Sequence, residues 1–254
     1  MINAILRRFE LMSLSNSELP SGYKKLEFIY NPNQAYIDTG VDGGHFNKTY
    51  CKFMMVQIVP DWSFIWGCRF KDINARSLAI QKGTSKFWMH QSNVDKVSNI
   101  DAAVDIMYEA DYNNGIYTIN GQTETFAPTD VFTNTYNCVL FGINDTNSIS
   151  DYSWRRFARM KCYSFKIWDN GKLIRDFIPA RQLSDDKVGM YDKVEGKFYS
   201  SAHEGYEFQG SDETLTTEYI EEETTSEDEL IDGFTVLPDG TTYHKEDSEK
   251  ETTE

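Results

Sequence analysis

The sequence predicts an all-β protein built as a two-sheet antiparallel jelly-roll sandwich, and three features indicate this. Short runs rich in Tyr, Phe, Val and Ile alternate apolar and polar side chains, which is the period of a half-buried strand. Turn residues such as Asn-Gly separate these runs at intervals of roughly 8 to 12 residues. No helical periodicity follows residue 20. Strands this numerous must bury their inner faces against a second sheet.

The clearest strand pattern runs from Lys161 to Phe208. It begins with YSFKIW, in which apolar and polar residues alternate. Residues 169–171 (Asp-Asn-Gly) tolerate positive φ, so a tight reversal is predicted there. A return strand is expected from Lys172 to Ile178, and Pro179 is expected to end it because proline has no N–H to donate. Residues 194–197 mark a further turn between two short strands.

The other expected strands follow the same alternation and are separated by polar turns. They are residues 25–30, 34–40, 50–59, 64–68, 77–80, 86–90, 103–109, 116–119, 137–142 and 157–168. Asn113-Asn114-Gly115 and Asn120-Gly121 are expected to be hairpin turns. A polar loop is expected over residues 71–76 and a longer one over residues 144–153.

The composition divides the chain into three parts. Residues 1–19 form a leader, or attachment arm, with apolar residues at helical spacing, and residues 20–210 form the jelly roll. Residues 211–254 form an acidic tail with sixteen Asp/Glu and two Lys, which buries too little apolar surface to fold alone. Within this tail, residues 233–243 are compatible with a small hairpin that turns at Pro-Asp-Gly.

The charge distribution limits the classes of binding partner that are expected. Residues 1–210 carry 24 Asp/Glu and 23 Lys/Arg, so the folded body is nearly neutral and nucleic acid is not an expected partner. No run of apolar residues reaches the length of a membrane helix, and the first residues do not read as a signal peptide. We therefore expect synthesis in a cytoplasm without membrane insertion.

The cysteines and histidines do not suggest a metal site. Cys51, Cys68, Cys138 and Cys162 form no CxxC pair and lie in strand-like apolar runs, so buried free thiols are expected. A disulfide such as Cys51–Cys68 remains an alternative, because spacing alone does not decide pairing. The four histidines are scattered. No cofactor is expected.

Two long motifs resemble a known family. The opening LPSGYKKLEFIYNPNQAYIDTG and the closing YSFKIWDNGKLIRDFIPA and VGMYDKVEGKFY are similar to the ends of concanavalin A-like (laminin-G-like) domains of the lectin/glucanase fold. Such domains occur in phage virion proteins, including head-fibre and tail proteins, and in surface proteins of gut bacteria. The resemblance covers about residues 19–210 and departs from the family pattern at residues 31–33, where Asn-Pro-Asn replaces the usual Ser-Thr-Gly.

The resemblance implies a non-enzymatic phage virion structural protein that presents a lectin-like domain at the particle surface for host-surface or glycan attachment. Its location would be the virion, with other virion proteins bound through the leader or the tail, and homo-oligomerisation is compatible with this role. A bacterial surface carbohydrate-binding adhesin and a degenerate glycoside hydrolase are the alternatives. Related glycosidases use an E-x-D-x-x-E strand, but here Glu109 and Asp111 are followed by Asn114, so no catalysis is expected.

Glycan binding requires aromatic faces for sugar CH groups and polar partners for hydroxyls, usually on loops. Two loops have this composition: residues 61–63, with Trp62, and residues 144–156. The candidate ligand-binding residues of the second loop are Asp145, Asn147, Asp151, Tyr152, Trp154 and Arg155. Asp145 and Asp151, with Asn147, are also weak candidates for Ca²⁺ ligands. Trp66, Trp88 and Trp168 have strand periodicity and are expected to be packing residues.

Overall fold

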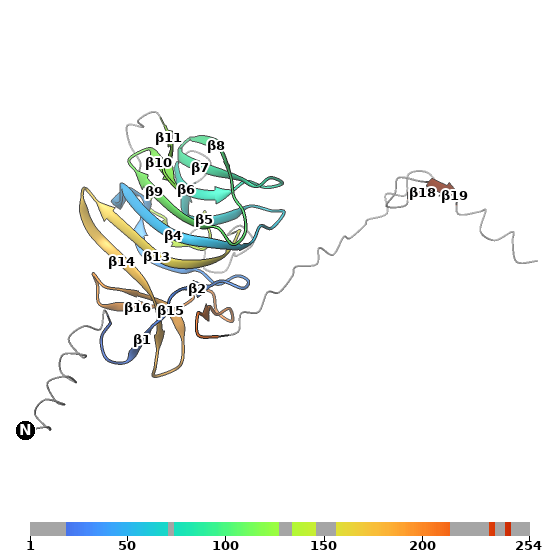
Figure 1. The fold of residues 1–254 in the computed structure, drawn as a ribbon. Coiled ribbons are helices and arrows are strands. Elements are labelled where there is room, and N and C mark those ends of the chain that lie inside the picture. Colours follow the sequence, from blue (N-terminus) through green and yellow to red (C-terminus); the bar gives the residue numbers. More distant parts are fainter. Residues whose placement is uncertain are drawn as a thin grey trace, which may run out of the picture. The chain divides into compact units, whose positions relative to one another are not determined.

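The computed structural model describes residues 19–70, 74–126, 134–145, 156–213, 234–236 and 242–244. The chain divides into two compact units, residues 1–217 and residues 218–254. The first unit contains two antiparallel sheets that pack face to face (Figure 1). The predicted all-β sandwich is therefore confirmed.

The larger sheet has eleven strands, and its main path runs in the order β11-β10-β9-β4-β13-β14-β15-β16. These strands are β11 (Gln122–Thr125), β10 (Ile116–Ile119), β9 (Met107–Asn113), β4 (Lys48–Gln57), β13 (Arg159–Asp169), β14 (Lys172–Gln182), β15 (Val188–Asp192) and β16 (Lys197–Tyr199). Three short strands complete it: β1 (Tyr23–Lys25) on β14, β2 (Ile29–Tyr30) on β13, and β17 (Gln209–Gly210) on β2.

The smaller sheet has six strands in the order β3-β12-β5-β6-β7-β8. They are β3 (Ile37–Asp42), β12 (Asn137–Leu140), β5 (Ser63–Phe70), β6 (Asn74–Ile80), β7 (Lys86–Ser92) and β8 (Val94–Asp101). A single 3-10 turn, η1 (Gly43–His45), is the only helical element among the described segments. None of the described segments forms a helix long and apolar enough to cross a membrane.

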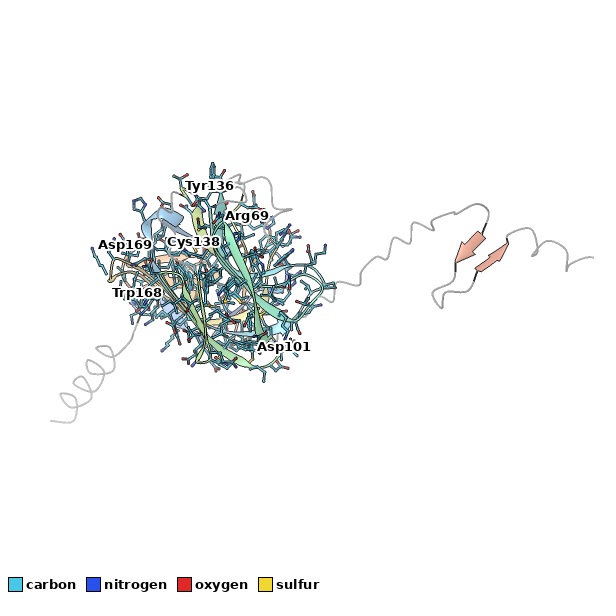
Figure 2. The ribbon with its side chains drawn as sticks, turned by 90° about the horizontal axis from the view of Figure 1, so that it is seen from above. Arg69, Asp101, Tyr136, Cys138, Trp168 and Asp169 are labelled. Atoms are coloured by element: carbon cyan, nitrogen blue, oxygen red, sulfur yellow. The ribbon has the colours of Figure 1, made fainter. Side chains whose placement is uncertain are left out.

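One hydrophobic core fills the space between the two sheets. Along β4, for example, Cys51, Phe53 and Met55 are fully buried while the residues between them are only partly covered. This alternation places every second side chain in the core. Figure 2 shows the side chains of both sheets, with Cys138 in the interior and Asp101 at the periphery. All four cysteines are buried free thiols, as expected.

The Asn-Gly turns have the backbone that their sequence predicts. Asn114-Gly115, Asn120-Gly121 and Asn170-Gly171 each have two consecutive positive φ angles, 46° and 82° at the last of them. This is the signature of the type I′ turn, whose twist matches the flanking strands. The three turns therefore form the hairpins β9–β10, β10–β11 and β13–β14.

The prediction that Pro179 ends its strand is wrong. β14 continues through Pro179 to Gln182, and Pro179 is paired with Met190 of β15. The Pro179 carbonyl still accepts a hydrogen bond from the Leu26 amide, at 3.1 Å. In an antiparallel ladder, successive residues do not all donate to the same neighbour, so a proline is tolerated where no N–H is required.

Further expectations about the strands differ from the structure. Strand β8 is not predicted, because its side chains are mostly polar and exposed and follow no clean alternation. It pairs only with β7, so its other edge has no partner strand among the described segments. The strand expected over residues 103–109 instead begins at Met107, and the strand expected over residues 25–30 is divided into β1 and β2.

The closing motif is held by one buried carboxylate. The Asp192 side chain is fully buried. It accepts hydrogen bonds from the amides of Asp176 (2.8 Å), Val194 (3.0 Å) and Glu195 (3.4 Å). The Arg175 guanidinium lies 3.5 Å from the same carboxylate. Asp192 thus joins the turn between β15 and β16 to strand β14.

An arginine in β14 holds the last described residues of the first unit. Arg181 pairs with Asp186 and Asp212, both at 2.9 Å, and with Glu213. The hydrogen bond from Arg181 lowers the pKa of Asp212 to about 2. The segment that follows β17 is therefore fastened to the large sheet by charge-assisted hydrogen bonds.

In the second unit, two short strands pair antiparallel. They are β18 (Phe234–Val236) and β19 (Thr242–His244), with Thr235 opposite Tyr243.

We predict that Asp192→Ala destabilises the sandwich by about 3 kcal/mol, because it leaves buried backbone donors without an acceptor. Urea unfolding followed by tryptophan fluorescence measures the change. Asp185→Ala is the matched control, since the Asp185 carboxylate is exposed and makes a long ion pair with Lys187, at 3.8 Å. Its loss should change stability by less than about 0.5 kcal/mol. Equal unfolding midpoints for the two variants would contradict the role given to Asp192.

Candidate functional site

The structure describes two of the seven candidate ligand-binding residues, Trp62 and Asp145. The other five lie outside the described residues: Asn147, Asp151, Tyr152, Trp154 and Arg155. The same holds for Asp151 as a Ca²⁺ candidate. Among the residues that the structure describes, no three His, Cys, Asp or Glu side chains are grouped as metal ligands.

The two loops that the sequence predicts separately meet at one strand, β5. Near the end of β5, the Arg69 amide donates to the carbonyl of Asn144, the residue directly before Asp145, at 2.8 Å. Near the start of β5, the Phe64 amide donates to the Arg156 carbonyl at 3.0 Å. Trp62 immediately precedes β5. The same strand of the six-stranded sheet therefore anchors Asn144, Arg156 and the residues around Trp62.

Aromatic side chains gather on the outer face of this sheet, in what we call the outer-face aromatic cluster. It consists of Trp62, Phe64, Ala79, Trp88 and Ile143. The Trp62 ring meets Trp88 edge-on, with centroids 4.9 Å apart, and lies 5.9 Å from Phe64. Phe64 and Trp88 also meet edge-on, at 6.0 Å. These are the tilted and T-shaped geometries that aromatic pairs prefer.

Strand register explains why these side chains meet. Phe64 of β5 is opposite Ala79 of β6, which is opposite Trp88 of β7. Residues opposite each other in antiparallel strands point to the same face. The neighbouring residues Leu78 and Met89 point to the core between the sheets. The cluster therefore lies on the face directed away from the main core.

The next row across the same face consists of small and polar residues. It runs from Gly67 through Ser77 and His90 to Asp95. A Cβ at Gly67 would lie 2.7 Å from the Ser77 Cβ and 3.3 Å from Ile143. The absence of a side chain at Gly67 thus lets Ile143 settle on the sheet and join the cluster.

A hydrogen bond fixes the central tryptophan. The Trp88 indole Nε1 donates to the Asp95 carboxylate at 2.9 Å, and the His90 ring meets the indole edge-on at 4.9 Å. Trp88 is only 6% exposed. The prediction that Trp88 is a packing residue is therefore correct, but it packs in the outer cluster and not in the main core. Sequence periodicity does not identify Asp95 as its partner, because that partner depends on the register of β7 and β8.

Trp62 is the member of the cluster that presents a partly exposed ring. The Arg156 guanidinium lies 5.9 Å from the centre of that ring. Asp145, also partly exposed, marks the other end of the loop. The site thus combines an indole held in place by buried aromatic neighbours with a guanidinium near its ring. Such a surface can stack on an apolar ring face and hydrogen-bond to hydroxyl groups.

The other two tryptophans lie elsewhere. Trp66 is buried in the main core, where it is parallel to Tyr117 at 6.3 Å. Trp168 is on β13 of the large sheet, half-buried, with the Lys48 ammonium 4.7 Å from its ring. Neither belongs to the outer-face aromatic cluster.

The acids considered for glycoside hydrolysis also lie elsewhere. Glu109 and Asp111 are on β9 of the large sheet, and Glu109 is exposed beside Lys52 at 3.2 Å. Burial raises the pKa of Asp111. Asn114 is part of the turn that follows β9. The two carboxylates and the outer-face aromatic cluster belong to different sheets, so the geometry does not assemble them into one site.

No family model and no curated protein matches the chain. Among solved structures, the fold is similar to that of a protein from Bacteroides ovatus that is provisionally named carbohydrate-binding, with 11% sequence identity and a TM-score of 0.47. The match covers 76% of this chain and 62% of that protein, so the chain spans less than two thirds of it. We base the functional proposal on the residues of the site.

We predict that the two outer-face tryptophans differ in their effect on stability. Trp88→Ala should cost about 3 to 5 kcal/mol, because it opens a cavity in a buried cluster and removes the donor to Asp95. Trp62→Ala should cost less than half as much, because its ring is only partly buried. Thermal and urea unfolding of both variants measure this. A Trp62→Ala variant as unstable as Trp88→Ala would show that Trp62 is a packing residue and not a partly exposed ring available to a ligand.

Proposed function

We propose that the chain is a non-enzymatic carbohydrate-binding domain whose ligand stacks on Trp62, at the surface of the outer-face aromatic cluster. The observation that carries this is a partly exposed indole supported by Phe64 and Trp88 and flanked by the Arg156 guanidinium. The CH groups on one face of a sugar ring can stack on such an indole. The Arg156 guanidinium is suited to donate hydrogen bonds to the hydroxyls of the sugar.

The support beneath Trp62 favours binding. A ring that is already held by its neighbours loses little conformational freedom when a ligand stacks on it, so less of the interaction free energy is lost to ordering. Arg156 is fixed at its backbone by the hydrogen bond from the Phe64 amide. The site is therefore largely preorganised on a sheet and not carried only by a loop.

A glycan array with the full chain, followed by calorimetry with the best glycan, tests this proposal. Trp62→Ala should weaken binding by up to about tenfold, since an aromatic stacking contact is worth about 0.5 to 1.5 kcal/mol and about 1.4 kcal/mol is a factor of ten in affinity. Arg156→Ala should weaken it as well, through the loss of charged hydrogen bonds. Both variants must remain fully folded at the assay temperature, which thermal unfolding of each variant checks.

Trp168→Ala is the matched control, because Trp168 is a half-buried tryptophan with a nearby cation on the other sheet. Its affinity for the glycan should equal that of the wild type. Loss of binding in Trp168→Ala but not in Trp62→Ala would overturn the proposed location. Binding to no glycan on a broad array would overturn the function.

The finer proposal is that this domain is displayed on a phage particle, with the leader or the acidic tail as the attachment segment. Its support is the resemblance of the opening and closing motifs to domains of virion proteins. The near-neutral body and the strongly acidic residues 211–254 are consistent with a division between a binding domain and an attachment segment.

We predict that an antibody against the folded domain labels purified particles from the producing host. Immunogold electron microscopy and mass spectrometry of gradient-purified particles measure this. A cytoplasmic protein of the host serves as the contamination control. Absence of the chain from particles that contain their other structural proteins would contradict virion display and would leave the carbohydrate-binding proposal standing.

A further inference from the structure

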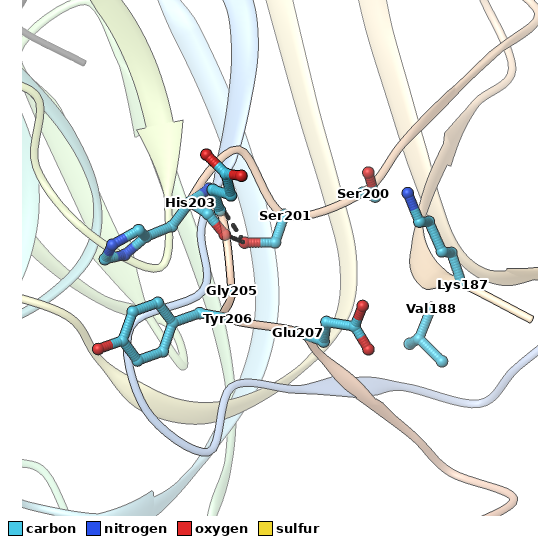
Figure 3. A pocket seen from close by; sticks show the side chains of 9 residues that line it. Lys187, Val188, Ser200, Ser201, His203, Gly205, Tyr206 and Glu207 are labelled. Atoms are coloured by element: carbon cyan, nitrogen blue, oxygen red, sulfur yellow. Dashed lines mark hydrogen bonds between the residues drawn. The ribbon is translucent and has the colours of Figure 1, made fainter. Parts of the chain in front are cut away.

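A concave site lies at the large sheet, and we call it the closing-loop pocket. It is a cavity of about 170 Å³ formed by the start of β15 and by the segment that follows β16 (Figure 3). It is lined by Lys187, Val188, Ser200, Ser201, His203, Glu204, Gly205, Tyr206 and Glu207. Pockets for drug-sized ligands usually enclose about 300 Å³ or more, so this one is suited to a smaller ligand.

The aromatic end of the pocket is rigid. His203 Nδ1 lies 2.9 Å from the Gln34 carbonyl oxygen, and the His203 amide donates to the Ser201 hydroxyl at 3.2 Å. The His203 ring stacks on Phe157, with centroids 6.0 Å apart, and lies 4.2 Å from the Tyr206 ring. Figure 3 shows the His203 and Tyr206 rings together at one end of the pocket. Tyr206 is therefore held in one orientation while part of its surface stays accessible.

The opposite end is polar. Lys187, Ser200 and Glu207 lie there, and Ser201 lies between the two ends (Figure 3). The Lys187 ammonium is 3.8 Å from the Asp185 carboxylate, so its charge is partly balanced outside the pocket. Glu204 and Glu207 are both exposed. The carboxylates around the pocket outnumber the ammonium group, which disfavours an anionic ligand.

From this arrangement we infer that the closing-loop pocket binds a single sugar ring that is neutral or carries an amine. An apolar ring face would lie on Tyr206, while hydroxyl or ammonium groups would donate to Glu207 and the serine hydroxyls would complete the contacts. The size of the cavity limits the ligand to one ring. This site is independent of the outer-face aromatic cluster, because its residues come from the start of β15 with the preceding Lys187 and from the segment after β16, all at the large sheet.

An NMR titration of the full chain with glucosamine, glucose and glucuronate tests the inference. Glucosamine below neutral pH should bind most tightly and glucuronate most weakly, because of the surplus of carboxylates. The shifted resonances should be those of residues 187–188 and 200–207. Equal binding of all three sugars, or shifts confined to other residues, would overturn the inference.

Two variants separate binding from folding. Glu207→Gln should weaken glucosamine binding by about tenfold, the usual effect of losing a charged hydrogen-bond acceptor. Tyr206→Leu keeps an apolar side chain against the core but removes the aromatic face. It should weaken the binding of every sugar tested. Glu109→Gln, an exposed acid on β9, is the control and should bind like the wild type. A Glu207→Gln variant with unchanged affinity for glucosamine would contradict the inference.

Trp62→Ala distinguishes this site from the outer-face aromatic cluster. It should leave the glucosamine titration at residues 200–207 unchanged, whatever it does to glycan binding on the array. If Trp62→Ala abolished the shifts at residues 200–207, the two sites would not be independent and the inference would fail. If the array showed no glycan but glucosamine bound at the pocket, only the proposal for the outer face would fail.

Discussion

The rest of the structure depends on the antiparallel pairing of β13 with β4 and β14. β13 lies between a strand from the first quarter of the chain and the return strand of the closing motif. It also pairs with β2, to which the last strand of the body, β17, is joined. Its inward side chains, such as Phe165 and Ile167, are fully buried in the main core. Ladder and core together thus bring the closing motif and the β1 and β2 part of the opening motif into one sheet, although more than 100 residues separate Leu26 from Lys161.

Once the large sheet covers one side of the six-stranded sheet, only the other side of that sheet remains for a second cluster. The outer-face aromatic cluster uses it. Its members come from β5, β6 and β7 and from the segment after β12, and small residues at Gly67 and Ser77 allow Ile143 to approach. An apolar cluster on the outside of a sandwich is unusual unless something binds there or a loop covers it. Here Asn144 and Arg156 both accept backbone hydrogen bonds from β5, and the cluster supports Trp62.

The two proposed sites divide the chemistry of carbohydrate recognition differently. At the outer face, a large indole supported by other aromatic rings offers area for stacking, and the polar groups lie at its edge. In the closing-loop pocket, the aromatic area is small and polar groups of both signs surround it. The first arrangement suits part of an extended glycan and the second a single ring. The outer-face aromatic cluster lies on the six-stranded sheet and the closing-loop pocket at the large sheet, so one scaffold carries two separate surfaces.

The sequence by itself determined the class of fold, the Asn-Gly turns, the burial of the four cysteines and most of the strands, because these depend on local periodicity and on the backbone preferences of single residues. It also located Trp62 and Asp145 as candidates. Only the tertiary structure decided that β14 continues through Pro179, that β8 exists, and that Trp88 faces outward to bond Asp95. It likewise decided that Trp62 and Arg156 meet at β5 and that residues 200–207 enclose a pocket. Each of these depends on which strand lies beside which and in what register, and that pairing is set by contacts between residues far apart in the chain, which local patterns do not record.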